Sequence, residues 1–193
     1  MPYPYNFTIN AAVLRELNHP LNIEQLECPE LERGQVLVEF EYSGVCRSQL
    51  MEVRGSRGPD RWLPHLLGHE GVGVVLDIGP GVTTVEIGDT VVVGWLETSG
   101  LDAKPAHYLN IDTGEKINSG KAVTFCSHSI VSENRVFKKP QTIDNKIAVL
   151  LGCALPTGAG MVLNETNPTP DDRILISGLG GIGLSVLVTL LNQ

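Results

Sequence analysis

Basic residues are scarce in this sequence of 193 residues. Lysine and arginine number 14 against 22 aspartates and glutamates, which gives a formal net charge of -8 at neutral pH. A surface that binds nucleic acid usually needs clustered lysine and arginine to neutralise the phosphates. The acidic balance therefore gives no reason to expect nucleic acid as a partner, and it favours a soluble protein.

Long apolar runs are also lacking. The longest apolar stretch, near 182–191, is too short to cross a bilayer, which takes about 20 residues. Residues 1–10 lack the basic and apolar regions of a signal peptide. We therefore expect no membrane partner and a cytoplasmic location. With 42% hydrophobic and 19% charged residues, the chain can bury a sizeable core.

Cysteine is rare, and no two cysteines form a C-x-x-C pair. The four cysteines stand alone in the sequence, at Cys28, Cys46, Cys126 and Cys153. In a reducing compartment, isolated thiols are more often buried or metal-binding than disulfide-bonded. Each of the four is therefore a candidate for either role.

Short segments rich in β-branched residues predict a mainly β structure for the first part of the chain. The segment 35–43 alternates, with valines and aromatic residues on one face, as a strand does. Further strands are expected at 71–79, 89–95 and 124–131. Short strands separated by turns favour a barrel or a sandwich. The polar stretch 97–121 is expected to be a long loop or a lobe.

The pattern becomes mixed α and β after residue 143. Asp144 can cap a helix over the apolar residues that follow it, and a second helix is expected around Thr157. The apolar segment RILIS at 173–177 predicts a strand, and the segment 184–191 predicts an apolar helix. The last two elements are typical of half a βαβ unit.

A glycine pattern of the form G-x-G-x-x-G lies between that strand and that helix, the context in which it indicates a dinucleotide-binding turn. Gly178 permits a tight turn, Gly180 lets the backbone approach a pyrophosphate, and Gly183 allows close packing of helix on strand. A merely flexible turn is the alternative. The acidic residue that binds the adenosine ribose is expected about 20 residues further on. That position lies past Gln193, so the sequence does not distinguish NAD from NADP.

Thiol, imidazole and carboxyl groups that suit zinc occur at Cys46, His69, Glu70 and Cys153. Three protein ligands plus a water molecule are the usual catalytic arrangement. The gaps of 23 and 84 residues between Cys46, His69 and Cys153 are far too long for a local zinc finger. Residue types alone therefore leave buried structural thiols as the alternative.

The neighbouring residues carry a family resemblance. GHEGVGVVLDIGPGV at 68–82, followed by GDTV at 88–91, resembles the zinc alcohol dehydrogenase signature G-H-E-x-x-G-x-x-x-x-x-G-x-x-V. The segments AAVLRE, PLNIEQLECPEL, GQVLVEFEYSGVCRS and LLGCALPTGAG are similar to the same family in the same order, over nearly the whole chain. The sequence therefore resembles the medium-chain, zinc-dependent alcohol dehydrogenases.

The resemblance implies a partly open GroES-like β-barrel followed by a Rossmann domain, with the zinc in the cleft between them. We therefore expect a mainly β fold with α+β elements. Residues 1–150 would form the GroES-like zinc-binding catalytic domain, and 151–193 a linker helix with the first β-α unit of a truncated Rossmann (α/β) segment. We also expect an incomplete enzyme, because the last apolar helix would lack the sheet that covers it.

The resemblance also implies site residues. Cys46, His69 and Cys153 would bind one catalytic zinc, and Glu70 would either ligate it transiently or act from beside it. Ser48 would receive the proton of the substrate alcohol, unless it is a simple turn serine. The substrate would be a small-molecule alcohol, aldehyde or ketone, and the hydride acceptor NAD or NADP.

Three more residues take roles from the resemblance. Arg47 would contact the cofactor pyrophosphate, and Thr157 would lie beside the nicotinamide. A surface salt bridge and a helix cap are the respective alternatives. Trp95 would line the substrate pocket or pack in the core. The substrate identity and the state of any homo-oligomer stay open.

The sequence departs from the family pattern in several places. Met51 stands where relatives with a proton relay often carry histidine, and Gln49 replaces a common aspartate that would hold the zinc-bound histidine. The stretch 97–121 contains no cysteine, so we expect no structural zinc. Packing, capping or surface roles are expected for the remaining cysteines and histidines, namely Cys28, Cys126, His19, His65, His107 and His128.

Two rival interpretations remain from the sequence. The chain is either the catalytic part of a zinc-dependent dehydrogenase or a noncatalytic zinc-binding GroES-like module that lacks most of the cofactor domain. A zinc-independent reductase of the same superfamily is a third candidate, which the combination of Cys46, His69, Glu70 and Cys153 disfavours.

Overall fold

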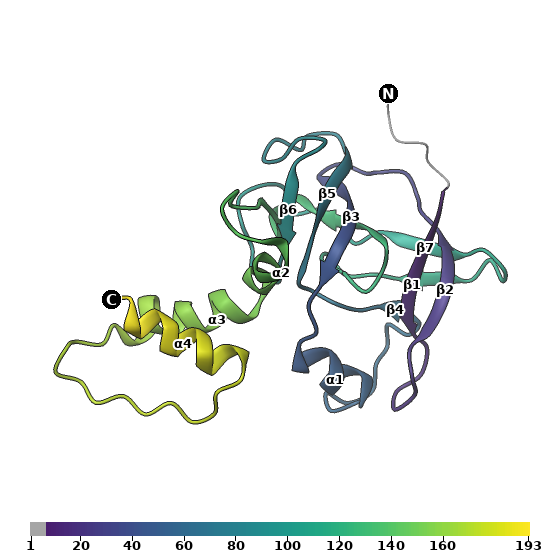
Figure 1. The fold of residues 1–193 in the computed structure, drawn as a ribbon. Coiled ribbons are helices and arrows are strands. Elements are labelled where there is room, and N and C mark those ends of the chain that lie inside the picture. Colours follow the sequence, from purple (N-terminus) through teal and green to yellow (C-terminus); the bar gives the residue numbers. More distant parts are fainter. Residues whose placement is uncertain (1–6) are drawn as a thin grey trace.

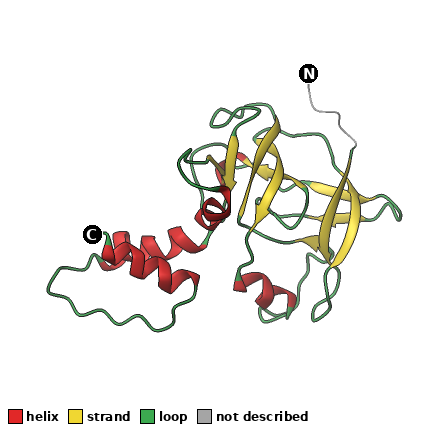
Figure 2. Cartoon of the chain, in the orientation of Figure 1, coloured by secondary structure: helices red, strands yellow, loops and turns green. Residues whose placement is uncertain are grey.

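The fold is rich in strands, with most of its helices towards the C-terminus (Figures 1 and 2). A computed structural model describes residues 7–193; residues 1–6, part of the segment searched above for a signal peptide, lie outside the described residues. Five strands form a closed barrel in the order β1 (Thr8–Leu14), β2 (Asn22–Glu27), β7 (His107–Asn110), β8 (Lys116–Asn118) and β4 (His65–Leu66). The strand-rich, barrel-containing fold class is confirmed, although the barrel is closed and not partly open as expected.

A second, five-stranded sheet packs beside the barrel. Its order is β10 (Val136–Lys138), β6 (Thr90–Val93), β5 (Gly71–Ile78), β3 (Gln35–Ser43) and β9 (His128–Ser132), and every neighbouring pair is antiparallel. The predicted strands at 35–43, 71–79 and 89–95 are thereby confirmed to within two residues at each end. Their valines fill the core because alternate residues of a strand face the same side.

The barrel has its own apolar core, which contains two of the four cysteines. Cys28 is fully buried there, and Cys126 packs against the same cluster. Burial raises the pKa of each thiol to about 12, so both stay protonated and unreactive at neutral pH. Tyr108 connects this core to the second sheet, since its hydroxyl accepts a hydrogen bond of 2.8 Å from the backbone N–H of Ile130.

Two of the sequence predictions for this half are wrong in part. The segment 124–127 is not a strand of the sheet; the backbone N–H groups of Thr124 and Phe125 donate to the carbonyl of Leu67 while the chain crosses between the two sheets. The stretch 97–121 is not a long loop, because β7 and β8 lie within it and close the barrel. These strands have only four and three residues, too few to show a clear alternation of apolar and polar side chains.

Short helices position the remaining residues. Helix α1 (Arg47–Val53) follows β3, and a single helical turn, η1 (Glu133–Arg135), follows β9. The C-terminal helices follow one another along the chain, as α2 (Asn145–Ala148), η2 (Val149–Gly152), α3 (Ala154–Gly160), η3 (Met161–Thr166) and α4 (Gly181–Leu191). Asp144 caps α2 by accepting a 2.8 Å hydrogen bond from the N–H of Lys146, as predicted. The helices expected around Thr157 and at 184–191 are confirmed as α3 and α4.

The strand predicted at 173–177 does not form. The segment is an extended connection without strand pairing, and its central Leu175 is 92% exposed. A strand requires a neighbour for its backbone groups, and none of the strands in residues 7–193 pairs with this segment. The predicted β-α unit is therefore present only as its helix, α4, which packs on α3 with the Ser185 hydroxyl donating to the carbonyl of Leu155 at 2.7 Å.

The helical segments 145–152 and 154–166 are separated by a bend. No single helix in the described part of the chain is long and apolar enough to cross a membrane. One bent pair, 145–152 with 154–166 at 57°, satisfies only the length and composition criteria.

Candidate metal centre

Three turns bring the predicted metal ligands to one place. Cys46 directly precedes α1, His69 lies between β4 and β5, and Cys153 separates η2 from α3. The side chain of Gln49 fixes the first turn, because its Oε1 accepts a 3.1 Å hydrogen bond from the backbone N–H of Cys46. The sheet brings the third turn near the other two, since the N–H of Trp95, just after β6, donates to the carbonyl of Gly152.

The two thiols and the imidazole are within reach of a single ion. The Sγ atoms of Cys46 and Cys153 and a ring nitrogen of His69 all lie within 4.8 Å of one another. Zinc bonds of about 2.3 Å to sulfur and about 2.0 Å to nitrogen place tetrahedral ligand atoms roughly 3.5–4 Å apart. A small inward movement of the side chains would satisfy that geometry.

The surroundings of His69 favour a neutral imidazole, which is the charge state that binds a metal. His69 is 9% exposed, and burial, assisted by the charge of Arg57, lowers the pKa of the imidazole, so the neutral ring is favoured. The side-chain amide nitrogen of Gln49 contacts Nδ1 of the ring. Nε2 is therefore the nitrogen left for a metal.

The Cys153 thiol lies where a nearby positive charge would favour its thiolate form. Burial, followed by the charges of Cys46 and Glu70, raises the pKa of the Cys153 thiol to about 11. A divalent cation between the sulfurs would offset both effects, since zinc deprotonates the thiols that bind it. Thr157 lies one helical turn further on and donates to the carbonyl of Cys153 at 2.7 Å, which ties the start of α3 to this ligand.

Glu70 lies beside the three ligands rather than among them. It is 3% exposed; burial raises the pKa of its carboxyl, and a hydrogen bond from the backbone of Ala154 opposes that rise. Its Oε2 is buried and has no hydrogen-bond partner within residues 7–193. Two glycines make room for this side chain: a Cβ on Gly44 would lie 2.6 Å from the Glu70 Cδ, and one on Gly152 would lie 2.7 Å from its Cβ. Sequence reasoning missed both glycines, although each stands within two residues of a predicted ligand.

A hollow of about 340 Å³ adjoins the centre and is lined in part by Gln49, His69 and Trp95. The Trp95 ring is 61% exposed and its centroid lies 5.8 Å from that of His69, so it borders the hollow instead of packing in the core. The Ser48 hydroxyl is buried, and the described residues offer it no hydrogen-bond partner. Ser48 therefore has a free donor and acceptor near the candidate ligands.

Two of the predicted cofactor-binding features, Arg47 and the glycine turn, make no polar contact with the candidate metal ligands among the described residues. Arg47 is exposed at the first position of α1. Gly178 has φ of +92°, and a Cβ on Gly183 would lie 2.0 Å from the carbonyl oxygen of Gly178, so both positions require glycine. A Cβ on Gly180 would meet open space. Within residues 7–193, no hydrogen bond or ion pair joins Arg47 or this turn to the three metal ligands.

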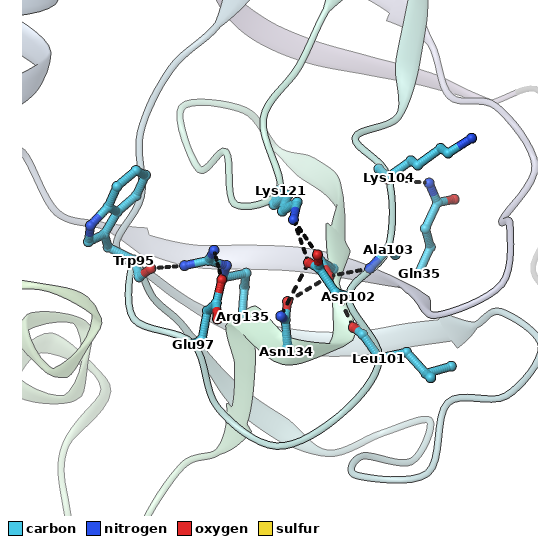
Figure 3. Close-up of polar contacts among 11 residues, drawn as sticks. Gln35, Trp95, Glu97, Leu101, Asp102, Ala103, Lys104, Lys121, Asn134 and Arg135 are labelled. Carbon is cyan, nitrogen blue, oxygen red and sulfur yellow. Dashed lines mark hydrogen bonds and ion pairs between the residues drawn. The ribbon is translucent and has the colours of Figure 1, made fainter.

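Polar contacts hold the lobe formed by residues 97–121 (Figure 3). The Lys121 ammonium lies 2.6 Å from Oδ2 of Asp102, and Oδ1 of the same carboxylate accepts from the Asn134 amide at 3.2 Å. Arg135 donates to the Trp95 carbonyl and, at 2.9 Å, to Glu97. The same guanidinium lies 5.7 Å from the centroid of the Trp95 ring, so it connects the lobe to the border of the hollow.

The fold and the cluster together describe a strand-built domain with a candidate metal centre of two cysteines and a histidine. Residues 32–141 match the family described as alcohol dehydrogenase GroES-like domain. The match covers more than half of the chain, which therefore belongs to this family.

Curated relatives agree with that assignment. The chain is 31% identical over 201 residues to the S-(hydroxymethyl)glutathione dehydrogenase of Synechocystis sp., covering 92% of this chain and 54% of the relative. It is 35% identical over 180 residues to the alcohol dehydrogenase of Rhizobium meliloti, covering 91% and 52%. The chain thus spans about half the length of the curated relatives it matches.

Solved structures show the same fold. The alcohol dehydrogenase zinc-binding domain protein of Burkholderia ambifaria superposes with a TM-score of 0.85 at 26% identity, covering 96% of this chain and 56% of that one. The benzyl alcohol dehydrogenase of Acinetobacter calcoaceticus gives 0.80 at 25% identity, with the same coverage of 96% and 56%.

Proposed function

We propose that this chain supplies the catalytic zinc centre of an alcohol dehydrogenase that transfers hydride between an alcohol or carbonyl substrate and NAD or NADP. The observation that carries the proposal is the convergence of Cys46, His69 and Cys153 within 4.8 Å. Ser48, two residues after Cys46, adds a buried hydroxyl without a hydrogen-bond partner among the described residues. The names of the relatives support it, since they are alcohol and S-(hydroxymethyl)glutathione dehydrogenases.

The donor set suits one catalytic zinc. Two thiolates and one imidazole leave a fourth position free, which distinguishes a catalytic from a structural site. When bound, zinc supplies a Lewis acid that polarises the alcohol or carbonyl oxygen of the substrate. Glu70, with one free carboxylate oxygen beside the ligands, tunes the charge of the centre.

The protein side chains handle the proton. Ser48 accepts the proton of the substrate alcohol through its free hydroxyl and passes it on. Met51, one turn along α1, is an exposed thioether that cannot accept a proton. The proton therefore leaves Ser48 by a route that does not use residue 51, either through water or through another group. Trp95 borders the hollow and limits access of solvent to the substrate.

The cofactor would meet the other side of the centre. Arg47 presents an exposed guanidinium that suits a pyrophosphate, and Thr157 lies in α3 directly after the Cys153 turn. Gly178, Gly180 and Gly183 open α4, whose N-terminus favours an anion. The small-molecule partner would be an alcohol, aldehyde or ketone.

Zinc content and activity of two matched cysteine variants test the proposal. Cys46→Ser removes a ligand, whereas Cys126→Ser alters a core thiol away from the ligand set. We expect Cys46→Ser to lose one equivalent of tightly bound zinc and the NAD-dependent oxidation of benzyl alcohol. We expect Cys126→Ser to keep both. Undiminished turnover of metal-free Cys46→Ser would refute the proposal and favour a zinc-independent reductase.

A noncatalytic zinc-binding module is the second candidate, favoured by the extended, unpaired segment 173–177 before the glycine turn. Calorimetry with NAD and with NADP separates the two functions. Micromolar affinity for either nucleotide supports the dehydrogenase, because a noncatalytic module has no need of one. Stoichiometric zinc without nucleotide binding by residues 1–193 supports the module for this chain.

A further inference from the structure

A second cluster of metal-binding side chains lies close to the hollow described above. Glu52 in α1, Asp60 in the following turn and His65 at the start of β4 each offer one ligand atom, and these atoms all lie within 4.8 Å of one another. The three residues share none of the ligands of the first centre. Glu52 and His65 line the same hollow as His69.

The hydrogen bonds of His65 determine which of its nitrogens is free. His65 is 7% exposed, and its Nδ1 lies 2.9 Å from the carbonyl oxygen of Leu66. Because a carbonyl only accepts, Nδ1 carries a hydrogen, and in the neutral ring Nε2 has the lone pair. Nε2 faces Asp60 Oδ2 at 2.9 Å and Glu52 Oε1 at 3.9 Å. Three acceptors thus converge on a point that requires a cation or a second proton on the ring.

The spacing of these atoms fits a metal ion. Bonds of about 2.0–2.2 Å from zinc to nitrogen and oxygen place neighbouring ligand atoms roughly 3–3.5 Å apart. The Asp60 and His65 atoms, 2.9 Å apart, lie slightly closer than that spacing, and the partly exposed Glu52, 3.9 Å from His65, needs an inward shift of roughly 0.5 Å. Asp60 is oriented for the role, because its Oδ1 accepts a 2.8 Å hydrogen bond from the N–H of Trp62.

Among the residues that the structure describes, the two arginines near the cluster do not pair with its carboxylates. Arg57 and Arg61 line a neighbouring hollow together with Glu52 and Asp60. In residues 7–193 neither arginine forms an ion pair with these carboxylates, and the Arg61 guanidinium lies 4.8 Å from the centroid of the Trp62 ring. Within 4 Å, the only basic group that faces Glu52 and Asp60 in the described chain is His65 itself.

We propose that Glu52, Asp60 and His65 form a second metal site, which takes a divalent transition-metal ion such as zinc. The two carboxylates balance the charge of the ion and the imidazole favours a transition metal over magnesium or calcium. Three protein ligands leave further coordination positions for water or for an oxygen of a ligand in the hollow.

Metal stoichiometry tests the proposal on residues 1–193. Metal-free protein is titrated with zinc by calorimetry, and bound metal is counted by elemental analysis after gel filtration. We expect two equivalents for the unchanged chain and one for Glu52→Gln with Asp60→Asn. Glu30→Gln with Asp112→Asn, a matched pair at exposed acidic positions, keeps both equivalents.

Cobalt identifies which site each ion fills. Cobalt bound by thiolates shows a sulfur-to-metal charge-transfer absorption, which oxygen and nitrogen ligands do not give. We expect this absorption for one of two equivalents in the unchanged chain, and its loss with retention of the other equivalent in Cys46→Ser. The second site and the first centre are thereby tested separately.

Two results would overturn the proposal. Either a single equivalent in the unchanged chain, located at the thiolates, or two equivalents retained by the Glu52→Gln and Asp60→Asn double variant shows that the cluster holds no metal. A proton on His65, paired with Asp60, would then fill the cluster. Circular dichroism of the double variant, whose side chains keep the native shapes, verifies that it is folded.

Discussion

The side-chain amide of Gln49 contacts Nδ1 of His69, which ties helix α1 to the histidine of the metal centre. The other end of the same amide is engaged as well, since Oε1 accepts from the backbone N–H of Cys46. The amide therefore presents an N–H to Nδ1. Metal binding through Nε2, however, puts a hydrogen on Nδ1 and requires an acceptor there.

Gln49→Glu is therefore expected to strengthen zinc binding. A carboxylate of the same length accepts from the Cys46 N–H and from Nδ1–H together, which raises the basicity of the ring. Because partners of ligating histidines change metal affinity by about 10–100-fold, we expect tightening of that order. Competition with a zinc chelator measures it, with Gln25→Glu on exposed β2 as the control. Equal affinities in the two variants would show that Gln49 does not act through His69.

The candidate ligands show how much of the metal site could be predicted from the sequence. Cys46, His69 and Cys153 were assigned through the family motif, because no local spacing relates residues 84 positions apart. Their convergence depends on β5, β6 and the Gly152 contact, which follow from long-range pairing. No sequence motif indicates the cluster at His65. Its geometry depends on the pairing of β4 within the folded barrel, which the sequence alone does not show.

Secondary structure was predictable where the side-chain pattern was strong. The predictions of the valine-rich strands β3, β5 and β6 agree with the structure, whereas β7 and β8 are too short, at four and three residues, to show a clear alternating pattern. The segment 173–177 shows the opposite error. Its composition is that of a buried strand, yet composition cannot supply the neighbouring strands that hydrogen bonding requires.

Glu133 is expected to make the fold sensitive to acid. Burial would raise the pKa of its carboxyl, but backbone N–H groups of Thr83, Thr84 and Leu101, at 2.7–2.9 Å, outweigh burial and hold the pKa below its ordinary value. A lowered pKa in the folded state means that this stabilisation is present above about pH 4.3, the ordinary value for glutamate, and is lost as pH falls through the folded value.

Glu133→Gln tests the predicted direction of the pH dependence of stability. The amide keeps the shape but turns one N–H against a backbone donor, so we expect a loss of about 2–3 kcal/mol in the free energy of unfolding at pH 7. The difference from the unchanged protein should shrink towards pH 3. Urea denaturation across this range measures it, and Glu30→Gln at an exposed position serves as the control. A difference that is constant with pH would contradict the assignment.

The polar contacts of the 97–121 lobe should differ in strength according to their burial. Ser132 is buried; its hydroxyl accepts from the Ala103 N–H and donates to Asn134 Oδ1, both at 2.8 Å. Ser132→Ala leaves these groups unsatisfied and should cost about 1–3 kcal/mol. Asp102→Asn removes an exposed ion pair with Lys121 and should cost less than Ser132→Ala, because solvent screens exposed charges. Thermal and urea denaturation measure the loss of stability in each variant. A larger loss in Asp102→Asn than in Ser132→Ala would show that the ion pair holds the lobe.

Gly152 is expected to control the position of Cys153. A Cβ at this residue would lie 2.6 Å from the carbonyl oxygen of Val93 and 2.7 Å from the Cβ of Glu70, closer than real Cβ contacts reach. Gly152→Ala must therefore separate η2 from β6 and move Cys153, the next residue. We expect a loss of about 1–3 kcal/mol in stability, as for other overpacked sites, together with weaker zinc binding.

Gly160→Ala separates this steric effect from the general effect of replacing glycine. Gly160 lies in α3, and its nearest neighbour to an added Cβ is the flexible Asn164 amide at 3.6 Å. Alanine in a helix should stabilise the protein by about 0.5–1 kcal/mol there. Urea denaturation with and without zinc, and chelator competition, compare the two variants. If Gly152→Ala binds zinc as tightly as Gly160→Ala does, then the contact of η2 with β6 does not position Cys153, and the ligand must be held by α3 alone.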